Sequence, residues 1–304
     1  MIAHQLALVR RELWEHRSIF ITPAAVGLVV TLLVITAYVA ASGFGGHVDI
    51  AIITAQNVGE TERRAALMAF LAGITSVFIL AAGILTIFYC LDTLYAERKD
   101  KSILFWRSLP VTDAETVISK LLTAAFAIPL ITFAAIVVAH LVNLVVSSIF
   151  VSIEGGSAAR LIWGSVPIFD VWTFFLVLLI ATPLWLSPFI GWFLFVSAWT
   201  KRSPLLTAFL PLLIVPMLEY FILRTTYLWE AIITRTGSLP LFRIADVSVF
   251  DEDSLRDMTA DSVSLLAIVD IFKFISHPGF WIGLVVCGLF TTAAIYVRRY
   301  RDES

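Results

Sequence analysis

The chain has few charged residues and few of the residue types that bind metals or act as nucleophiles. Only 14% of its 304 residues are charged, and it contains two cysteines and five histidines spread along the sequence. It has no Gly-rich loop ending in Gly-Lys-Ser/Thr, no His-Glu-x-x-His motif and no Gly-x-Ser-x-Gly motif. The sequence therefore excludes a P-loop ATPase, and we expect a non-catalytic protein with no metal site and no cofactor.

Apolar residues make up 60% of the sequence, and they are concentrated in long uninterrupted runs. A helix of about 20 apolar residues crosses the hydrocarbon core of a bilayer, whereas the strands of a β-barrel alternate apolar and polar residues. We therefore predict an all-α integral membrane protein with one transmembrane domain over residues 1–304. Its six spans are expected at about 18–41, 67–91, 121–150, 171–198, 205–223 and 279–297.

The basic residues predict how these spans are oriented. With the N-terminus inside, the cytoplasmic segments are 1–17, 92–120, 199–204 and 298–304, and they contain 13 of the 21 Lys and Arg residues. The positive-inside rule therefore predicts that both termini are cytoplasmic. The net charge of −2, without a dense basic patch, indicates no nucleic-acid partner.

Residues 1–17 are typical of an amphipathic helix that lies in the plane of the membrane interface. Four apolar residues recur on one helical stripe, and the charged residues lie elsewhere on the helix. The stripe consists of Ile2, Leu6, Val9 and Leu13. The helix is either a simple anchor or a functional elbow that leads into the first span.

Segment 92–120 is a charged connection between two spans that also carries an apolar patch. Charges of both signs beside apolar side chains favour a contact with a soluble protein, and we predict a short docking helix here. Leu109 and Pro110 are expected to end that helix, and Thr112 with Glu115 forms a capping-box pattern for the next one. The alternative is a solvated run of charges that only fixes the topology.

Few polar residues fall within the predicted spans. His140 and Asn143 share one face of the third span, and Glu219 lies near the outer end of the fifth. Such residues usually face the interior of a bundle or a wet cavity, so they are candidates for a transport pathway, although hydrogen bonding between helices is the commoner use. Pro183 and Pro188 are expected to kink the fourth span.

Segment 224–278 is the longest connection expected outside the membrane. It is acidic around residues 246–261, and an apolar stretch too short to span a bilayer follows. The segment is either a lid over the bundle or an element that binds a partner.

These features together resemble the ABC-2 type permeases, the membrane subunits of bacterial ATP-binding-cassette exporters. In that family the loop after the second span has an acidic-Arg pair, an apolar patch, a Leu-Pro-Val-like corner and a Lys that enters the third span. The family usually has a Gly-Thr-like pair after the acidic-Arg pair, whereas this chain has Lys101 and Ser102. The matching positions are Glu97 and Arg98, then Leu104 to Trp106, then Leu109, Pro110 and Val111, then Lys120.

The resemblance implies a function and a set of partners. It implies a permease in the bacterial cytoplasmic membrane that pairs with a second permease, either an identical copy or a related one, and with two ATPase subunits. Such a permease exports a substrate using their ATP hydrolysis. The first, second and fifth spans are then expected to line the path. Residues implied to bind or orient the ATPase are Glu97, Arg98, Lys99, Leu104, Phe105, Trp106, Arg107, Leu109 and Pro110.

Two other classes stay open at this point. A stand-alone secondary transporter needs a central ion or proton site, for which the sequence offers only His140, Asn143 and Glu219. A membrane enzyme needs polar groups clustered at one face, for which the acidic outer segment is the only candidate. The sequence favours an apolar or amphipathic substrate, because the spans carry few groups that could solvate an ion.

Overall fold

The computed structural model describes residues 2–43, 59–101, 111–243 and 264–300. These residues form helices joined by short connections, and their only β-type pairing is an isolated antiparallel bridge between Phe242 and Val269. The all-α fold class predicted from the sequence is confirmed. The α-helices are α1 (Ile2–Glu15), α2 (Ser18–Gly43), α4 (Glu60–Lys99), α6 (Asp113–Leu122), α7 (Ile128–Ile153), α8 (Ile168–Trp185), α9 (Ser187–Trp199), α10 (Pro204–Leu223), α11 (Tyr227–Gly237), α13 (Ile271–Ser276) and α14 (Pro278–Tyr300).

Six helices of the described chain are long and apolar enough to cross a membrane, and each overlaps one of the predicted spans. They are Ser18–Ser42, Glu60–Lys99, Asp113–Ile153, Ile168–Trp185, Pro204–Leu223 and Pro278–Tyr300. The second and third of these helices extend well beyond the apolar runs. Their polar ends, which include Glu60 and Asp113, continue the helix past the part that is long enough to cross the hydrocarbon core.

The third span is continuous from Asp113 to Ile153 and begins with the predicted capping box. The Thr112 side chain accepts a hydrogen bond from the Glu115 backbone N–H at 3.2 Å, and the Glu115 carboxylate accepts one from the Thr112 N–H at 2.9 Å. A π-helical turn, η1 (Thr123–Ala127), joins α6 to α7. Pro129 follows in the first turn of α7, and because proline lacks an N–H, it removes one regular helical hydrogen bond at this turn.

The fourth span is broken, as its prolines predict. α8 ends at Trp185 and α9 begins at Ser187, so the run expected at 171–198 is two helices. Pro183 lies inside α8 and Pro188 lies in the first turn of α9, where its missing N–H costs nothing. The break allows α8 and α9 to take different directions.

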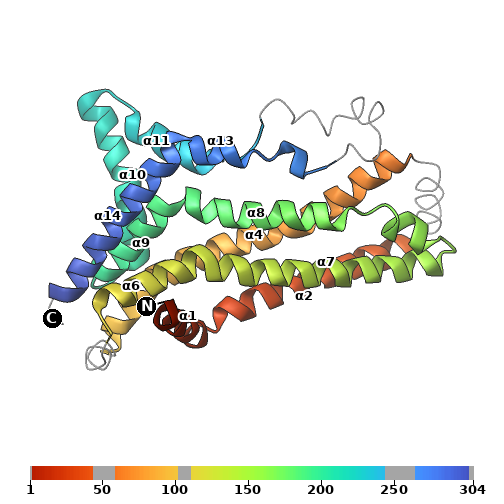
Figure 1. Ribbon diagram of the computed structural model, residues 1–304, viewed down its shortest axis with the longest axis horizontal. Coiled ribbons are helices and arrows are strands. Elements are labelled where there is room, and N and C mark those ends of the chain that lie inside the picture. The colour runs from red at the N-terminus through yellow and green to blue at the C-terminus, as the bar shows by residue number, and fades with distance from the viewer. Residues whose placement is uncertain (1, 44–58, 102–110, 244–263, 301–304) are drawn as a thin grey trace.

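The helices form two groups that meet at one end of the molecule. α2, α4, α7 and α8 run side by side along the long axis, whereas α9, α10 and α14 are gathered at the left-hand end of Figure 1. α14 packs closely along α9 at Gly191, where an added Cβ would lie 3.0 Å from the backbone of Cys287. Because α8 belongs to one group and α9 to the other, the broken fourth span connects them.

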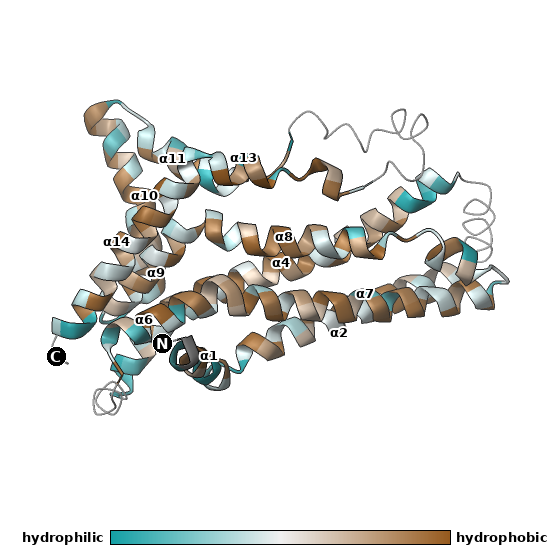
Figure 2. Ribbon diagram, viewed as in Figure 1, coloured by the Kyte–Doolittle hydropathy of each residue, from teal (hydrophilic) through white to brown (hydrophobic). Residues whose placement is uncertain are grey.

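α1 begins and α14 ends at the same end of the molecule, which we call the terminal end (Figure 1). The long helices are predominantly hydrophobic in their middle parts, and hydrophilic residues lie in α1, in α6, in the first turns of α4 and in the last turns of α14 (Figure 2). α1 and α14 both pack against α6, so the terminal end brings together the first and last helices and the start of the third span.

Candidate functional site

Six charged side chains from four helices meet at the terminal end, where α4 ends and α6 begins. We call them the ion-pair cluster, and they are Arg11 and Glu12 of α1, Glu97 of α4, Asp113 and Lys120 of α6, and Arg298 of α14. Three are basic and three are acidic, so their formal charges balance.

Lys120 lies at the centre of the cluster and is fully buried. Its ammonium group donates to both carboxylate oxygens of Glu12 at 3.0 Å and lies 2.8 Å from Oε1 of Glu97. The hydroxyl of Thr93 accepts its third hydrogen bond at 2.8 Å. An ammonium group has three protons to donate, so this arrangement supplies enough partners to compensate for the loss of water.

Glu97 is 3% exposed and links three basic residues. Besides Lys120, its carboxylate accepts a hydrogen bond from Arg298 and lies 3.5 Å from Nη2 of Arg11. Arg298 also donates from Nε to Asp113 at 2.9 Å. Arg298 therefore ties the end of α14 both to the last turns of α4 and to the first residue of α6.

Glu12 places the N-terminal helix in the same cluster. It is fully buried and accepts further hydrogen bonds from Tyr89 at 3.0 Å and Thr93 at 3.3 Å. Burial by itself raises the pKa of Glu12, but the positive charges of Lys120 and Arg11 outweigh that effect and hold the pKa below its usual value. Glu12 is therefore ionised at neutral pH.

α1 presents two faces, which explains why the sequence did not reveal the role of Glu12. Leu8 and Glu12, four residues apart, point inward and are buried, whereas Leu6 of the predicted apolar stripe is 63% exposed. Leu6 thus faces away from the protein, whereas Val9 is partly buried and Leu13 packs against the core, so only part of the stripe is available to lie against lipid. Glu12 was assigned to the polar face, because periodicity alone does not separate a charge facing water from one facing a buried partner.

Arg298 was also missed, because a basic residue after an apolar run is the usual signature of a topology signal. Lys120 was identified only as a position that matches the ABC-2 pattern. The sequence offers one signal for such residues, which is a charged residue on the helix face that is otherwise expected to be buried. That signal identifies an ion pair only when the structure shows an opposite charge facing it.

The end of α4 is also tied to the 199–204 turn. The Arg98 guanidinium donates to the carbonyl oxygens of Ser197 and Thr200, at 2.5 and 2.8 Å, and the Tyr95 hydroxyl donates to the Arg202 carbonyl at 3.1 Å. α4 then ends with Lys101 in the left-handed region, at φ 56°. Helices commonly end with a glycine in this conformation, and Lys101 is the position at which the ABC-2 pattern usually has glycine.

The residues expected to contact an ATPase are not equivalent in the structure. Glu97 is buried in the cluster, so it cannot touch a partner in this conformation, and only a positioning role is compatible with its surroundings. Arg98 is partly buried against the 199–204 turn, and Lys99 is exposed. The remaining expected contacts lie outside the described residues, and they are Leu104, Phe105, Trp106, Arg107, Leu109 and Pro110.

His140 and Asn143 of α7 make hydrogen bonds to neighbouring helices. His140 is fully buried, with Nε2 3.0 Å from the Thr75 hydroxyl and 3.1 Å from the Leu71 carbonyl of α4. Asn143 donates to the Thr31 hydroxyl of α2 at 3.2 Å. These two side chains therefore link α7 to its neighbours in the bundle.

Glu219 has a local role at the start of α11. Its carboxylate accepts hydrogen bonds from the backbone N–H groups of Tyr227 and Leu228, both at 2.9 Å. These are the first residues of α11, whose N–H groups have no partner within the helix. Glu219 thus fixes the direction in which α11 leaves α10. The sequence predicted α10 but not α11.

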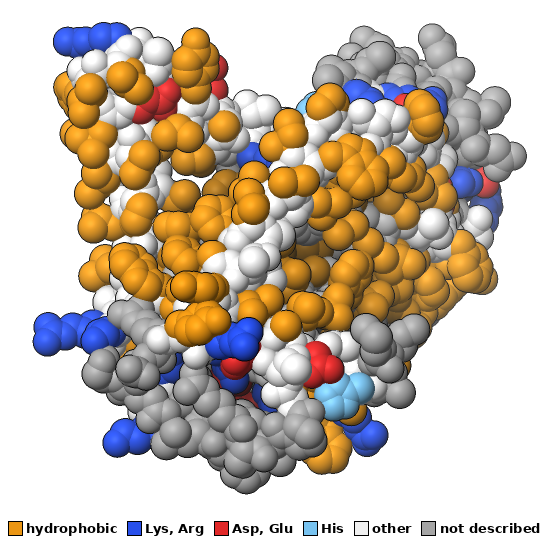
Figure 3. Space-filling model, turned by 60° about the vertical axis from the view of Figure 1, so that its left-hand side comes forward, with side chains coloured by type: hydrophobic (Ala, Val, Ile, Leu, Met, Phe, Trp, Pro, Cys, Tyr) orange, Lys and Arg blue, Asp and Glu red, His pale blue; other side chains and the backbone are white. Residues whose placement is uncertain are grey.

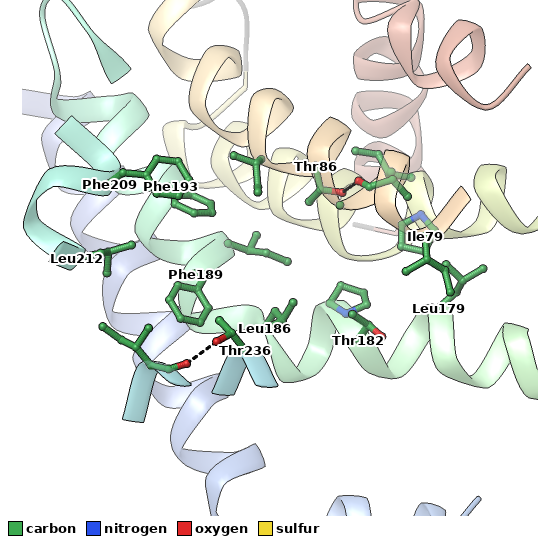
Figure 4. Close-up of a pocket in the computed structure, with 18 of the residues that line it drawn as sticks. Ile79, Thr86, Leu179, Thr182, Leu186, Phe189, Phe193, Phe209, Leu212 and Thr236 are labelled. Carbon is green, nitrogen blue, oxygen red and sulfur yellow. Dashed lines mark hydrogen bonds between the residues drawn. The ribbon is translucent and has the colours of Figure 1, made fainter. Parts of the chain in front are cut away.

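A cavity of about 540 Å³ lies between the two helix groups. Its walls come from one face each of α4, α8 with α9, α10 and α11, together with the start of α7. Side chains from these helices point toward a common space in Figure 4, among them Ile79, Leu179, Phe189 and Leu212. Of the three spans expected to line a transport path, α4 and α10 contribute to this cavity and α2 contributes no residue. The rest of the lining comes from α8, α9, α11 and the start of α7.

Six apolar spans, a balanced ion-pair cluster at one end and an apolar cavity between the helices define a multi-pass membrane protein. Over residues 65–235 the sequence matches the family described as ABC-2 family transporter protein. This match covers more than half of the chain, and the chain belongs to that family. It is therefore a membrane-spanning transporter permease, of a kind that is generally non-catalytic and associates with an ABC ATPase. No curated protein and no solved structure matches it.

Proposed function

We propose that this chain is the permease subunit of an ATP-binding-cassette exporter in the bacterial cytoplasmic membrane, driven by separate ATPase subunits. Segment 102–110 acts as its coupling element, and both termini are cytoplasmic. The observation that carries this proposal is the 2.8 Å pair between Glu97 and Lys120. These residues lie on opposite sides of segment 102–110 in the sequence, so the pair joins the two stems of the proposed coupling element.

The cluster supplies a route by which a push on the coupling element reaches the membrane helices. Because Glu97 and Lys120 are held by Glu12 and Arg298, a displacement of the stems must also move α1 and α14 or break buried ion pairs. Breaking a buried pair costs several kcal/mol, so moving the helices together is favoured. The cluster thus converts a local contact into a concerted motion of four helices.

The roles of the individual residues follow from their burial. Glu97, Lys120, Glu12 and Arg298 are positioning residues, because none is exposed enough to touch a partner. Lys99 is exposed and contacts the ATPase, with Leu104, Phe105 and Trp106 filling a groove on it. Arg107 binds the ATPase beside them, and Leu109 and Pro110 end the coupling helix. The permease works as a dimer with a second copy, and two ATPases bind the pair.

The test is co-purification with the ABC ATPase encoded beside this chain. Trp106→Ala and Lys99→Glu are expected to weaken the complex, because they alter proposed contact residues. Arg299→Glu is the matched control, since Arg299 is exposed at the same end but lies outside the proposed contact. A complex weakened by the first two changes and unaffected by the third supports the proposal. If no ATPase associates, and transport instead stops when ion gradients are collapsed with ATP intact, a secondary transporter replaces it.

A further inference from the structure

The cavity between the helix groups has walls that are almost entirely apolar. Each wall follows a helical repeat: Ile79, Ala82, Gly83, Thr86 and Ile87 in α4, and Trp229, Ile232, Ile233 and Thr236 in α11. Residues spaced by three or four lie on one face of a helix, so α4 and α11 each turn a single apolar face toward the cavity. α11 is amphipathic in this sense, although it is too short to span a bilayer.

The hydroxyl groups in the lining are already used by the helices that carry them. Thr86 donates to the Ala82 carbonyl at 2.8 Å, Thr182 to the Leu178 carbonyl at 2.7 Å, and Thr236 to the Ile232 carbonyl at 2.9 Å. Two of these bonds are visible as dashed lines in Figure 4. Among the residues that the structure describes, no charged side chain is part of the lining. Apart from the Trp229 indole N–H, the described lining therefore offers few hydrogen-bond donors to a sugar or a peptide backbone, and no charge to an ion.

The wall formed by α11 is held in place by Arg235. Its guanidinium lies over the Trp185 ring at 4.2 Å and donates to the carbonyl oxygens of Trp185, at 2.9 Å, and Gly279, at 2.6 Å. Arg235 thus fastens α11 to the end of α8 and the start of α14. On the side of the molecule formed by α9, α10 and α14, the surface is hollowed and hydrophobic side chains line the hollow (Figure 3).

We propose that this cavity binds the hydrocarbon chain of an amphipathic substrate, whose polar part stays outside the cavity. The inference rests on the proposed function and names its substrate class. An apolar cavity does not hold water well, and an empty one forfeits dispersion contacts along its whole lining. A volume of about 540 Å³ is within the range of sites for small molecules, and helices long and apolar enough to span a membrane form most of the walls.

Gly83 permits a direct test, because it lies in the cavity wall and an added Cβ would meet no atom within 4 Å. Gly83→Leu therefore adds side-chain volume to the cavity from a position where the added Cβ meets no other atom. Gly73→Leu is the matched control: Gly73 belongs to the same helix, also has nothing within 4 Å, and is not part of the lining. Ile233→Trp fills the cavity from the opposite wall, and serves if Gly83→Leu does not fold.

The probe is palmitic acid carrying a photoactivatable diazirine within its chain, and peptide mapping locates the adducts on the permease in nanodiscs. We expect adducts on the cavity faces of α4, α9 and α11, reduced about tenfold by Gly83→Leu and unchanged by Gly73→Leu. Equal labelling of the cavity and of the outward face of α10, or no effect of Gly83→Leu, overturns the proposal. So does the absence of labelling in a dimer whose second copy closes the cavity.

A second arm separates a transported chain from a resident bilayer lipid. With the partner ATPase present, ATP is expected to lower cavity labelling of the wild-type complex, and an ATPase variant unable to hydrolyse ATP is expected to leave it unchanged. Labelling that does not respond to ATP, in a complex that does hydrolyse it, overturns the substrate assignment but leaves the permease function standing. Failure of the ATPase to associate at all is seen separately by co-purification.

Discussion

At the residue scale, the terminal end of the molecule depends on buried charges that compensate one another. Lys120 and Glu12 are fully buried, and each is tolerated because opposite charges contact it: Glu12 and Glu97 contact Lys120, and Lys120 and Arg11 contact Glu12. Removing one partner of a buried ion pair leaves the other charge without compensation, whereas removing both can be nearly neutral. The cluster is therefore expected to show strong non-additivity between its members.

Lys120→Met is predicted to destabilise the protein by about 3–5 kcal/mol, because it leaves Glu12 and Glu97 buried without their shared cation. Adding Glu12→Gln is predicted to restore part of that loss. Thermal unfolding of the detergent-solubilised permease, compared across wild type, both single variants and the double variant, measures the coupling. Strictly additive effects of the two substitutions would show that the pair seen here does not form.

Acid is predicted to weaken the contribution of Glu12. Its folded-state pKa is lowered, so the ionised carboxylate stabilises the fold at neutral pH, and this contribution is lost as the pH falls below about 4.3 and through the lower folded-state value. The stability difference between wild type and Glu12→Gln should therefore shrink on acidification from pH 7. A difference that grows on acidification would contradict the ion pairing of Glu12.

At the scale of single elements, the sequence predicted most helix positions well and their ends less well. The fifth span was expected at 205–223 and runs from Pro204 to Leu223, because Ser-Pro marks its start and the left-handed Arg224 ends it. The capping box at Thr112 and the kink between Pro183 and Pro188 were also predictable, since both depend on local backbone chemistry. α11 was not predicted, because its short run of apolar residues becomes one face of a helix only against the cavity.

The same contrast holds within the candidate site. The position of the charged connection could be predicted, because charges between two apolar runs are visible in the sequence. The burial of Glu97 could not be predicted, since its partners Lys120 and Arg298 are 23 and 201 residues further along the chain, and only the packing of α6 and α14 brings them together. The predicted apolar patch 104–106 lies outside the described residues and stays a prediction.

Lys101→Gly is predicted to stabilise the end of α4 by about 1 kcal/mol, because glycine adopts the left-handed conformation without steric cost. A rise in Tm measures the gain. Lys99→Gly provides the control: Lys99 is the last residue of α4 and has helical geometry, so glycine there should lower Tm instead. Equal effects at the two positions would mean that backbone strain at Lys101 is absent.

At the scale of the whole molecule, two helix groups meet at the ion-pair cluster and enclose an apolar cavity further along. The broken fourth span belongs to both groups, and α1, α4, α6 and α14 converge at the end of α4 and the start of α6. This arrangement places the proposed contact with an ATPase next to the charges that hold the helices together. A signal received at the terminal end can therefore reach the cavity walls through α4, which carries Glu97 and also lines the cavity.

The most direct test of this account compares ATP hydrolysis by the permease–ATPase complex carrying Arg298→Gln with that of the complex carrying Arg299→Gln. Arg298 is 4% exposed and joins α14 to Glu97 and Asp113, whereas its neighbour Arg299 is exposed. We predict that both complexes assemble. The quantity compared is the difference in ATP hydrolysis rate between the ATPase alone and the ATPase bound to the permease. Arg298→Gln is predicted to lower this difference about tenfold, which corresponds to a loss of roughly 1.4 kcal/mol of coupling free energy. Hydrolysis that is equally coupled in the two complexes would contradict the proposed role of the cluster.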